Sequence, residues 1–344
     1  MACKKPKYRK SAGCVVACGQ CTPCLLKKQR EKASRVLLES RANGITDTLF
    51  VTLTYDDEHL PYTFSRMEMQ RLTPKQKAQG FEPRKELKTY SCPTGTLYPP
   101  DLINFLKKLR YYGSTKGFQI RAVYAGEYGD EKRRPHYHLI IWGIPYKERM
   151  MIFRSWTDKQ KKLLCHHSRL DIQIPKNERH IANYLSKYLL SDKKRKDAAS
   201  LNGAFPEFYR TSKGLGLQYA DGVSKALTKE SGLANLWIDG KVPSSFFFDG
   251  KNYPIDRYMK AKIYAKLPPI FAEELPKIAL EDYKAKMYDV YEDALMDEAF
   301  AAKALTIPLE QGIELAVQRL NARRAVEIEI KHSFFNSKRR SSDV

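Results

Sequence analysis

The alternation of hydrophobic and polar positions predicts a small set of strands in the first half of the chain. They cover residues 49–55, 118–128, 134–143 and 171–174, which are rich in β-branched and aromatic side chains. A short, charged turn separates the second from the third, so we expect these two to form an antiparallel hairpin. Thr52 and Thr54 lie on one face of the first strand, where we expect a packing role.

A period of three to four residues predicts helices between these strands. They cover residues 25–42, 98–110, 147–164 and 177–190. The second of them starts at a pair of prolines, which suit the first turn of a helix. Residues 62–98 are polar and rich in turn-forming residues, and a connection of that length inside a compact domain is usually functional or disordered. We therefore interpret 62–98 as an insertion.

The composition changes in the second half of the chain. Residues 197–256 are rich in Gly, Ser, Phe and Tyr without a firm period, which predicts loops and short strands. Residues 271–300 carry nine Asp and Glu against three Lys in a helical pattern, and residues 309–330 are helical again. We expect 197–344 to form a mainly helical appendage whose function the sequence does not reveal.

Two histidines stand one residue apart in the apolar run at 134–143. Because side chains alternate across a strand, His136 and His138 share one face, and Tyr137 points to the other. Ile140 and Trp142 continue the histidine face. Two imidazoles held side by side on a rigid strand supply half of a metal site.

A third ligand should be a carboxylate on the neighbouring strand. Glu127 is the best candidate because it precedes the hairpin turn, nine residues before His136. The register across that turn is not fixed by the sequence, so Asp56 and Asp57 remain alternatives. Two imidazoles and one carboxylate suit Mg²⁺ or Mn²⁺ with positions left open for a substrate.

Two tyrosines form the other candidate for chemistry. Tyr184 and Tyr188 are four residues apart, on one face of the predicted helix, and Lys187 lies between them. A phenol with a pKa of about 10 is a weak nucleophile until it is activated. Among 21 tyrosines such a spacing also arises by chance, so packing is the alternative.

The charge of the chain points to an acidic partner. The formal net charge is +22, from 61 Lys and Arg against 39 Asp and Glu, which favours DNA, RNA or an anionic membrane. No apolar stretch is long enough to span a bilayer, and no apolar segment follows the basic start as in a signal peptide. Along the predicted helix at 25–42, the residues that would contact phosphates are Lys27, Lys28, Arg30, Lys32 and Arg35; a solvated helix face is the alternative.

Five of the seven cysteines lie within the first 24 residues, and the odd total argues against a disulfide framework. The close spacing of Cys14, Cys18, Cys21 and Cys24 makes them candidate ligands of Zn²⁺ or of an iron–sulfur cluster. Reduced thiols on a loop are the alternative. The sequence contains no Gly-x4-Gly-Lys-Ser/Thr phosphate loop, so we expect duplex unwinding to come from a partner.

Taken in order, three stretches resemble the three motifs of the HUH endonucleases. They are the strand that ends in Thr-Leu-Thr-Tyr at 52–55, the His-hydrophobic-His strand, and the helix with Tyr-x-x-Lys-Tyr. The chain resembles most the rolling-circle replication initiators of microviruses of the gokushovirus type. This resemblance implies an α+β fold with a central antiparallel sheet of the RRM or ferredoxin-like type, flanked by helices. The domains would be a basic, cysteine-rich segment at 1–45, the endonuclease domain at 46–196, and the C-terminal region at 197–344.

The resemblance also implies an activity. The family's metal ligands would be His136, His138 and Glu127, and its catalytic residues Tyr184, Tyr188 and Lys187. Such a protein nicks origin DNA, keeps a 5′-phosphotyrosine link, and leaves a 3′-hydroxyl that primes replication. Its partners would be origin DNA with the helicase and DNA polymerase of a bacterial host, in whose cytoplasm it would act. The alternatives are an HUH transposase or relaxase, and a non-catalytic DNA-binding protein built on the cysteines.

Overall fold

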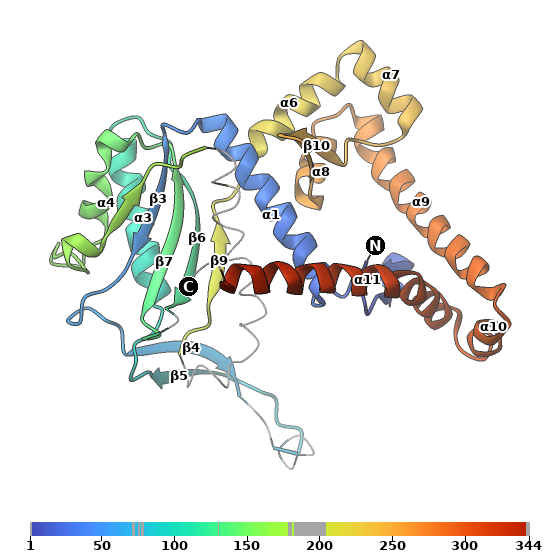
Figure 1. Ribbon diagram of the computed structural model, residues 1–344, viewed down its shortest axis with the longest axis horizontal. Coiled ribbons are helices and arrows are strands. Elements are labelled where there is room, and N and C mark those ends of the chain that lie inside the picture. The colour runs from blue at the N-terminus through green and yellow to red at the C-terminus, as the bar shows by residue number, and fades with distance from the viewer. Residues whose placement is uncertain are drawn as a thin grey trace. The chain divides into compact units, whose positions relative to one another are not determined.

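The computed structural model describes residues 2–70, 73–74, 76, 79–129, 131–177, 181 and 204–341. The chain forms two compact units (Figure 1). We call residues 36–215 the sheet unit, and residues 1–35 together with 216–344 the helical unit. None of the helices in the described part of the chain combines the length and the apolar composition needed to span a bilayer.

The sheet unit contains a five-stranded antiparallel sheet with the strand order β8-β3-β7-β6-β9. The α+β fold with an antiparallel sheet, which the resemblance implied, is thus confirmed, and the histidine strand β7 is its central strand. The elements of this unit, in chain order, are β3 (Thr48–Leu53), β4 (Thr63–Met69), β5 (Lys85–Ser91), α3 (Pro99–Ser114), β6 (Arg121–Tyr128), β7 (Pro135–Trp142), η2 (Tyr146–Glu148), α4 (Met150–Ser155), η3 (His167–Arg169), β8 (Asp171–Gln173) and β9 (Phe208–Thr211).

The helices α3 and α4 cover one face of this sheet (Figure 1). The apolar side chains that α3 presents every three or four residues pack against alternate residues of β3 and β7. On β7, the residues Tyr137, Leu139 and Ile141 all point into this core and are fully buried. The alternation that was read from the sequence is thus confirmed, and it leaves the histidines to the opposite face.

A smaller apolar cluster lies on the opposite face of the sheet. It consists of residues from β3, β6 and β7 together with residues before and after the sheet strands: Val36, Phe50, Val123, Ile140, Trp142, Ile181 and Leu215. The indole nitrogen of Trp142 donates a 3.1 Å hydrogen bond to the Ser40 hydroxyl, which satisfies a buried polar group. This cluster covers the Ile140 and Trp142 end of the histidine face and leaves the His136 end more open.

Residues 62–98 contain an antiparallel hairpin, in which β4 pairs with β5. Phe64 of β4 is buried and stacks on Tyr90 of β5, with ring centroids 5.1 Å apart. Its ring also meets Phe205 edge-on, which fixes the base of the hairpin to the sheet unit.

The helical unit is built mostly from the C-terminal half of the chain, which confirms the expected helical appendage. Its elements are β1 (Lys7–Arg9), η1 (Lys10–Ala12), β2 (Cys14–Val16), the first part of α1 (Thr22–Asn43), α6 (Leu217–Leu227), α7 (Glu230–Asp239), β10 (Ser245–Phe248), β11 (Lys251–Pro254), α8 (Arg257–Tyr264), α9 (Pro269–Leu295), α10 (Glu298–Ala304) and α11 (Leu309–Ser341).

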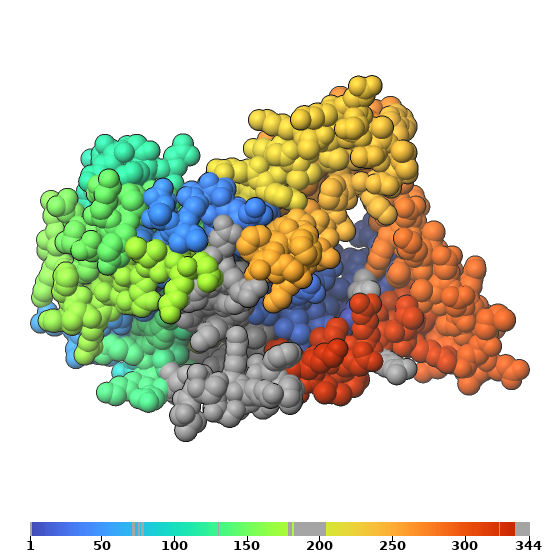
Figure 2. All heavy atoms as spheres, turned by 45° about the horizontal axis from the view of Figure 1, so that its top comes forward, coloured from blue at the N-terminus to red at the C-terminus, as the bar shows by residue number. Residues whose placement is uncertain are grey.

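The helices α9, α10 and α11 pack against one another, as the orange and red atoms show (Figure 2). The N-terminal hairpin of β1 and β2 packs against them through Val15, which is fully buried beside Tyr291 and Ile313. The Tyr283 hydroxyl donates a 2.7 Å hydrogen bond to the Val15 carbonyl oxygen. The first residues of the chain thus belong to the core of its last helices.

The helix predicted at 147–164 is wrong over most of its length, because α4 covers only Met150–Ser155. The helix ends where Trp156 turns into the core, fully buried, and donates a 2.8 Å hydrogen bond from its indole nitrogen to the Thr54 carbonyl oxygen. The chain then forms a tight loop. An isolated antiparallel β-bridge joins Thr157 to Leu163, and Lys161 has a positive φ in the turn between them. Burial of a large aromatic side chain outweighs the helix propensity of this segment.

The region at 197–256 contains the expected short strands, but it also includes helices that the sequence did not predict. It supplies β9, which pairs with β6 and completes the sheet beyond residue 196, where we expected the endonuclease domain to end. It also forms the helices α6 and α7 of the helical unit. A four-residue edge strand is too short to show a period in the sequence.

Candidate active site

The pairing of β6 with β7 places Glu127 directly opposite His136. His138 lies two residues further along the same face. The Glu127 Oε1 atom is 3.1 Å from Nε2 of His136 and 3.0 Å from Nε2 of His138. The structure thus brings the three candidate ligands together, with one oxygen from β6 and two nitrogens from β7.

The second nitrogen of each imidazole also has a hydrogen-bonding partner. His136 Nδ1 lies 3.1 Å from the Arg134 carbonyl oxygen, and His138 Nδ1 lies 3.3 Å from the Thr52 hydroxyl. Histidines that bind metals commonly use their other ring nitrogen in this way, because the contact fixes the tautomer and the ring orientation. Thr52 on β3 is therefore more than a packing residue, which the sequence did not reveal.

The electrostatics of the three residues suit a cation. Burial alone would raise the pKa of the Glu127 carboxyl, but hydrogen bonds with His136 and His138 lower that pKa to about 2. For His136, burial opposes the charged form, yet the contact with Glu127 leaves its pKa above the usual value. Glu127 is thus ionised at neutral pH and brings a negative charge to the two nitrogens.

The site is open enough for a substrate. The side chains of Glu127, His136 and His138 are 22%, 21% and 13% exposed, so they lie neither on the bare surface nor in the core. These three residues form one of the groups of His, Cys, Asp and Glu in the described part of the chain that can hold a metal ion. Oxygen and imidazole donors together fit a divalent cation that keeps further positions for other ligands.

The alternative third ligands lie elsewhere. Asp56 Oδ1 is 2.7 Å from Nδ1 of His59 and also accepts a 2.9 Å hydrogen bond from the His59 backbone N–H. Asp57 forms an ion pair with Arg134, with Oδ1 2.6 Å from Nη1. The structure thus favours Glu127 over either aspartate.

A family model of replication-associated proteins of the ORF2 type matches residues 48–194, which include all three motifs. The chain is similar to this family over these residues. The "Replication-associated protein ORF2" of Spiroplasma virus 4 is 27% identical over 315 residues, which cover 86% of this chain and 86% of the relative. The family resemblance expected from the motifs, to the replication proteins of microvirus-like phages, is therefore confirmed.

Two further relatives match a shorter stretch. The "Replication-associated protein VP4" of Bdellovibrio phage phiMH2K is 30% identical over 132 residues, 37% of this chain and 31% of the relative. The "Replication-associated protein ORF4" of Chlamydia phage 1 is 27% identical over 127 residues, 37% of this chain and 23% of the relative. No solved structure matches the chain at a significant level.

The tyrosine motif of the family, with Tyr184, Lys187 and Tyr188, lies outside the described residues. Ile181, three residues before Tyr184, is described and is fully buried. It packs with Ile140 and Trp142, which share a face of β7 with the histidines. Ile181 itself therefore lies on the histidine face of the sheet.

The basic residues of α1 have partners within the helical unit. Lys28 Nζ donates a 2.8 Å hydrogen bond to the Gly19 carbonyl oxygen, and Arg30 donates one of 3.3 Å to that of Asn252. Arg35 lies over the ring of Tyr258, 4.8 Å from its centroid. The side chain of Lys27 is 71% exposed and lies 3.9 Å from the Glu31 carboxylate. Lys32 also takes part in an interaction, so the prediction that these five residues contact DNA stays a prediction.

Of the four candidate zinc ligands, the structure brings together Cys18, Cys21 and Cys24. The fourth member of the group is Cys3, whereas Cys14 lies buried on β2. The register of the N-terminal hairpin explains this difference. Lys7 pairs with Val16 at the open end of the hairpin, so the residues before β1 lie beside the residues after β2. Cys14 pairs with Arg9 at the opposite end, near the turn.

The Thr52 hydroxyl gives a test of the site that does not remove a ligand. If Glu127, His136 and His138 bind a divalent ion, we expect Thr52→Val to weaken that binding about 10- to 100-fold, because the His138 ring loses the contact that orients it. Metal affinity would be measured by titrating Mn²⁺ into the metal-free protein. Thr54→Val, two residues along the chain, is the matched control, and equal affinities for both variants would show that Thr52 only packs.

Proposed function

We propose that the protein is an HUH-type endonuclease and strand transferase that nicks origin DNA at a specific site to start rolling-circle replication. The observation that carries this proposal is the convergence of Glu127, His136 and His138 within 3.1 Å, in residues that are similar to a family of replication-associated proteins. A structural ion pair would not need both imidazoles turned toward one carboxylate oxygen with their other nitrogens engaged.

Glu127, His136 and His138 would hold Mg²⁺ or Mn²⁺. Bound there, such an ion would polarise the scissile phosphate and offset the charge that develops on its oxygens. The chain's own contribution is to fix the donors: Thr52 and the Arg134 carbonyl orient the two rings, and the sheet holds the carboxylate opposite them. The partial exposure of the site lets a phosphate of single-stranded DNA approach it.

The nucleophile would be Tyr184 or Tyr188. Its phenolic oxygen would form a bond to phosphorus while the bond from phosphorus to the 3′ oxygen breaks, and the released 3′ oxygen takes up a proton. The energy of the original bond is kept in the 5′-phosphotyrosine, so the reaction can be reversed to join ends. Two tyrosines allow a second cut while the first link persists. Lys187 would contact a phosphate. Ile181, three residues before Tyr184, supports the proposal because it packs with Ile140 and Trp142 of β7.

The partners in this proposal are origin DNA and the helicase and DNA polymerase of a bacterial host, with the reaction taking place in the host cytoplasm. The excess of 22 positive charges suits the DNA, and the hairpin of β4 and β5 in the insertion is a candidate DNA contact. The priming 3′-hydroxyl is what a polymerase would extend.

Mapping the nick on the cognate circular DNA tests the proposal directly. Supercoiled DNA that carries the phage's origin should be cut at one position in the presence of Mg²⁺ or Mn²⁺, with protein attached to the 5′ end. Binding without cleavage would instead support the non-catalytic DNA-binding protein. Cleavage with free 5′-phosphates would contradict the tyrosine chemistry.

The basic residues of α1 have their own test. If they contact phosphates, replacing Lys27, Lys28 and Arg30 with alanine should weaken binding to all DNA sequences. The plot of log affinity against log salt should also lose about one unit of slope for each lost contact. Binding measured by fluorescence anisotropy at several salt concentrations gives this slope.

A control variant separates specific contacts from net charge. Lys225, Lys241 and Lys251 are exposed in the same unit, and replacing all three with alanine removes the same charge. We expect this variant to keep the slope of the unchanged protein. Equal slopes for the two triple variants would assign Lys27, Lys28 and Arg30 to solvent.

A further inference from the structure

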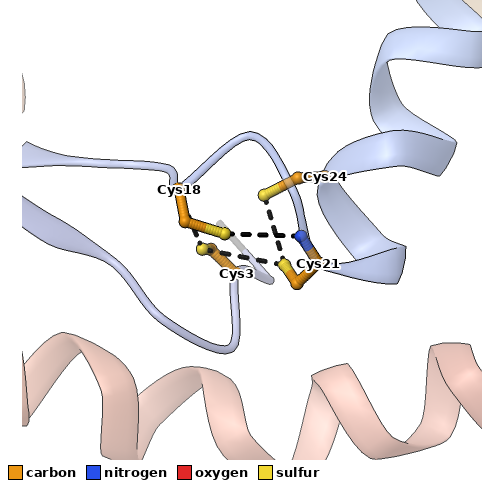
Figure 3. A group of neighbouring side chains, drawn as sticks. All are labelled: Cys3, Cys18, Cys21 and Cys24. Atoms are coloured by element: carbon orange, nitrogen blue, oxygen red, sulfur yellow. Dashed lines mark hydrogen bonds between the residues drawn. The ribbon is translucent and has the colours of Figure 1, made fainter. Parts of the chain in front are cut away.

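Four cysteine sulfurs meet at the start of α1, far along the chain from the Glu127 site. Cys3, Cys18, Cys21 and Cys24 point toward one another (Figure 3), and their sulfur atoms all lie within 4.8 Å of one another. The Sγ atom of Cys21 is 3.4 Å from that of Cys24 and 3.8 Å from that of Cys3. In a tetrahedron of sulfurs bound to one Zn²⁺ at about 2.3 Å, neighbouring sulfurs are about 3.8 Å apart. All seven cysteines of the chain are free thiols, so no disulfide explains this arrangement.

We propose that Cys3, Cys18, Cys21 and Cys24 bind a structural Zn²⁺ ion that joins the first residues of the chain to α1.

Backbone N–H groups aimed at the sulfurs support this proposal. The N–H groups of Cys18 and Cys21 point at Sγ of Cys3 and of Cys18, at 3.2 Å and 3.4 Å. That of Lys4 points at Sγ of Cys21, at 3.5 Å. Such donors stabilise sulfur in the negatively charged form that binds metals. Reduced thiols on a loop would not need these donors.

The surroundings offset part of the charge that four thiolates would bring. Cys24 lies in the first turn of α1, where the N-terminal end of the helix dipole favours negative charge. The ammonium group of Lys28 lies at the loop between Cys18 and Cys21, where it donates to the Gly19 carbonyl oxygen. One small ion fits four sulfurs this close together, whereas a multi-iron cluster holds its thiolates on separate metal atoms and therefore further apart.

The ion would also stabilise the helical unit. The chain between Cys3 and Cys18 is the hairpin of β1 and β2, whose Val15 lies in the core with α9, α10 and α11. Closing the sulfurs around one ion fixes both ends of this hairpin, and in a small metal site the binding free energy is folding free energy. The site thus holds the start of α1 and the C-terminal helices in one unit.

The test measures zinc in the purified full-length protein by elemental mass spectrometry. Zn²⁺ can also bind to imidazoles, so every variant carries His136→Ala and His138→Ala. We expect one zinc per chain, its loss in Cys3→Ala and in Cys24→Ala, and its retention in Cys14→Ala. Cys14 is a matched control because it is a buried thiol of the same hairpin.

A second measurement does not depend on the folding of a variant. Protein expressed with Co²⁺ in place of Zn²⁺ should show the intense visible bands and sulfur charge-transfer absorption of tetrahedral four-sulfur coordination. The proposal is overturned if the protein carries no metal and four accessible thiols, if iron replaces zinc, or if zinc depends on Cys14 and not on Cys3. Nicking activity is not the readout, so this proposal and the proposed function can fail independently.

Discussion

Replacing either His136 or His138 with alanine should reduce nicking of origin DNA on the order of a thousandfold, with DNA binding retained. Each imidazole supplies one of the three donor atoms of the site, with its Nε2 at 3.1 Å (His136) or 3.0 Å (His138) from the third donor, Glu127 Oε1. Removing one donor from a site with few ligands loses the ion, and with it several kcal/mol of charge stabilisation, where each 1.4 kcal/mol is worth about tenfold in rate. Binding depends instead on phosphate contacts spread over a basic surface, so it should persist.

The nicking rate is measured on labelled origin DNA with added Mg²⁺ or Mn²⁺. DNA binding is measured by fluorescence anisotropy. His166→Ala is the matched control, because His166 is exposed and its ring contacts the Ser168 hydroxyl at 2.7 Å rather than the site. Full nicking in the presence of EDTA would contradict the proposal that the site needs a divalent ion.

Glu127→Ala should be nearly as severe as the histidine variants, since it removes the one carboxylate of the group. Asp57→Ala should keep most of the activity, because Asp57 pairs with Arg134 at the surface. If the Asp57 variant is inactive and the Glu127 variant is not, the third ligand has been assigned to the wrong strand.

The position of the candidate metal site could be predicted from the sequence because it depends on local rules. Alternation along one strand places His136 and His138 on the same face, and the short turn makes the neighbouring strand antiparallel. The sequence does not give the register of that pairing. The register places Glu127 opposite His136 and so favours Glu127 over Asp56 and Asp57 as the third ligand. A one-residue shift would have moved Glu127 to the face that packs on α3.

What the sequence could not reveal depends on contacts between distant segments. Thr52 is 86 residues from His138 along the chain, and only the pairing of β3 with β7 brings its hydroxyl to the ring. The sequence analysis missed Cys3 because Cys14, Cys18, Cys21 and Cys24 already supplied four closely spaced ligands. Only the pairing of β1 with β2 shows that Cys3 lies beside Cys21. The predicted helix at 147–164 was wrong for a similar reason, since Trp156 leaves the helix to fill the core.

The double substitution of Tyr184 and Tyr188 with phenylalanine should yield a folded protein that binds DNA but forms no covalent adduct. Phenylalanine keeps the aromatic ring and therefore its packing, while the hydroxyl that attacks phosphorus is gone. The variant therefore separates the nucleophile from the packing alternative directly. The adduct would be detected as labelled DNA that migrates with the protein on a denaturing gel.

Each single substitution should keep some nicking, because the remaining tyrosine can still attack. It should impair the second cut, so that unit-length circles are no longer released while the first 5′ link persists. Tyr111→Phe is the matched control, since Tyr111 is an exposed tyrosine on α3 of the same unit. Peptide mass analysis should find the 5′-linked nucleotide on Tyr184 or Tyr188. An adduct on another tyrosine, or normal nicking by the double variant, would refute the assignment of Tyr184 and Tyr188. This test is independent of the Glu127 site, because a metal-assisted cut by water would need that site and yet leave no protein on the DNA.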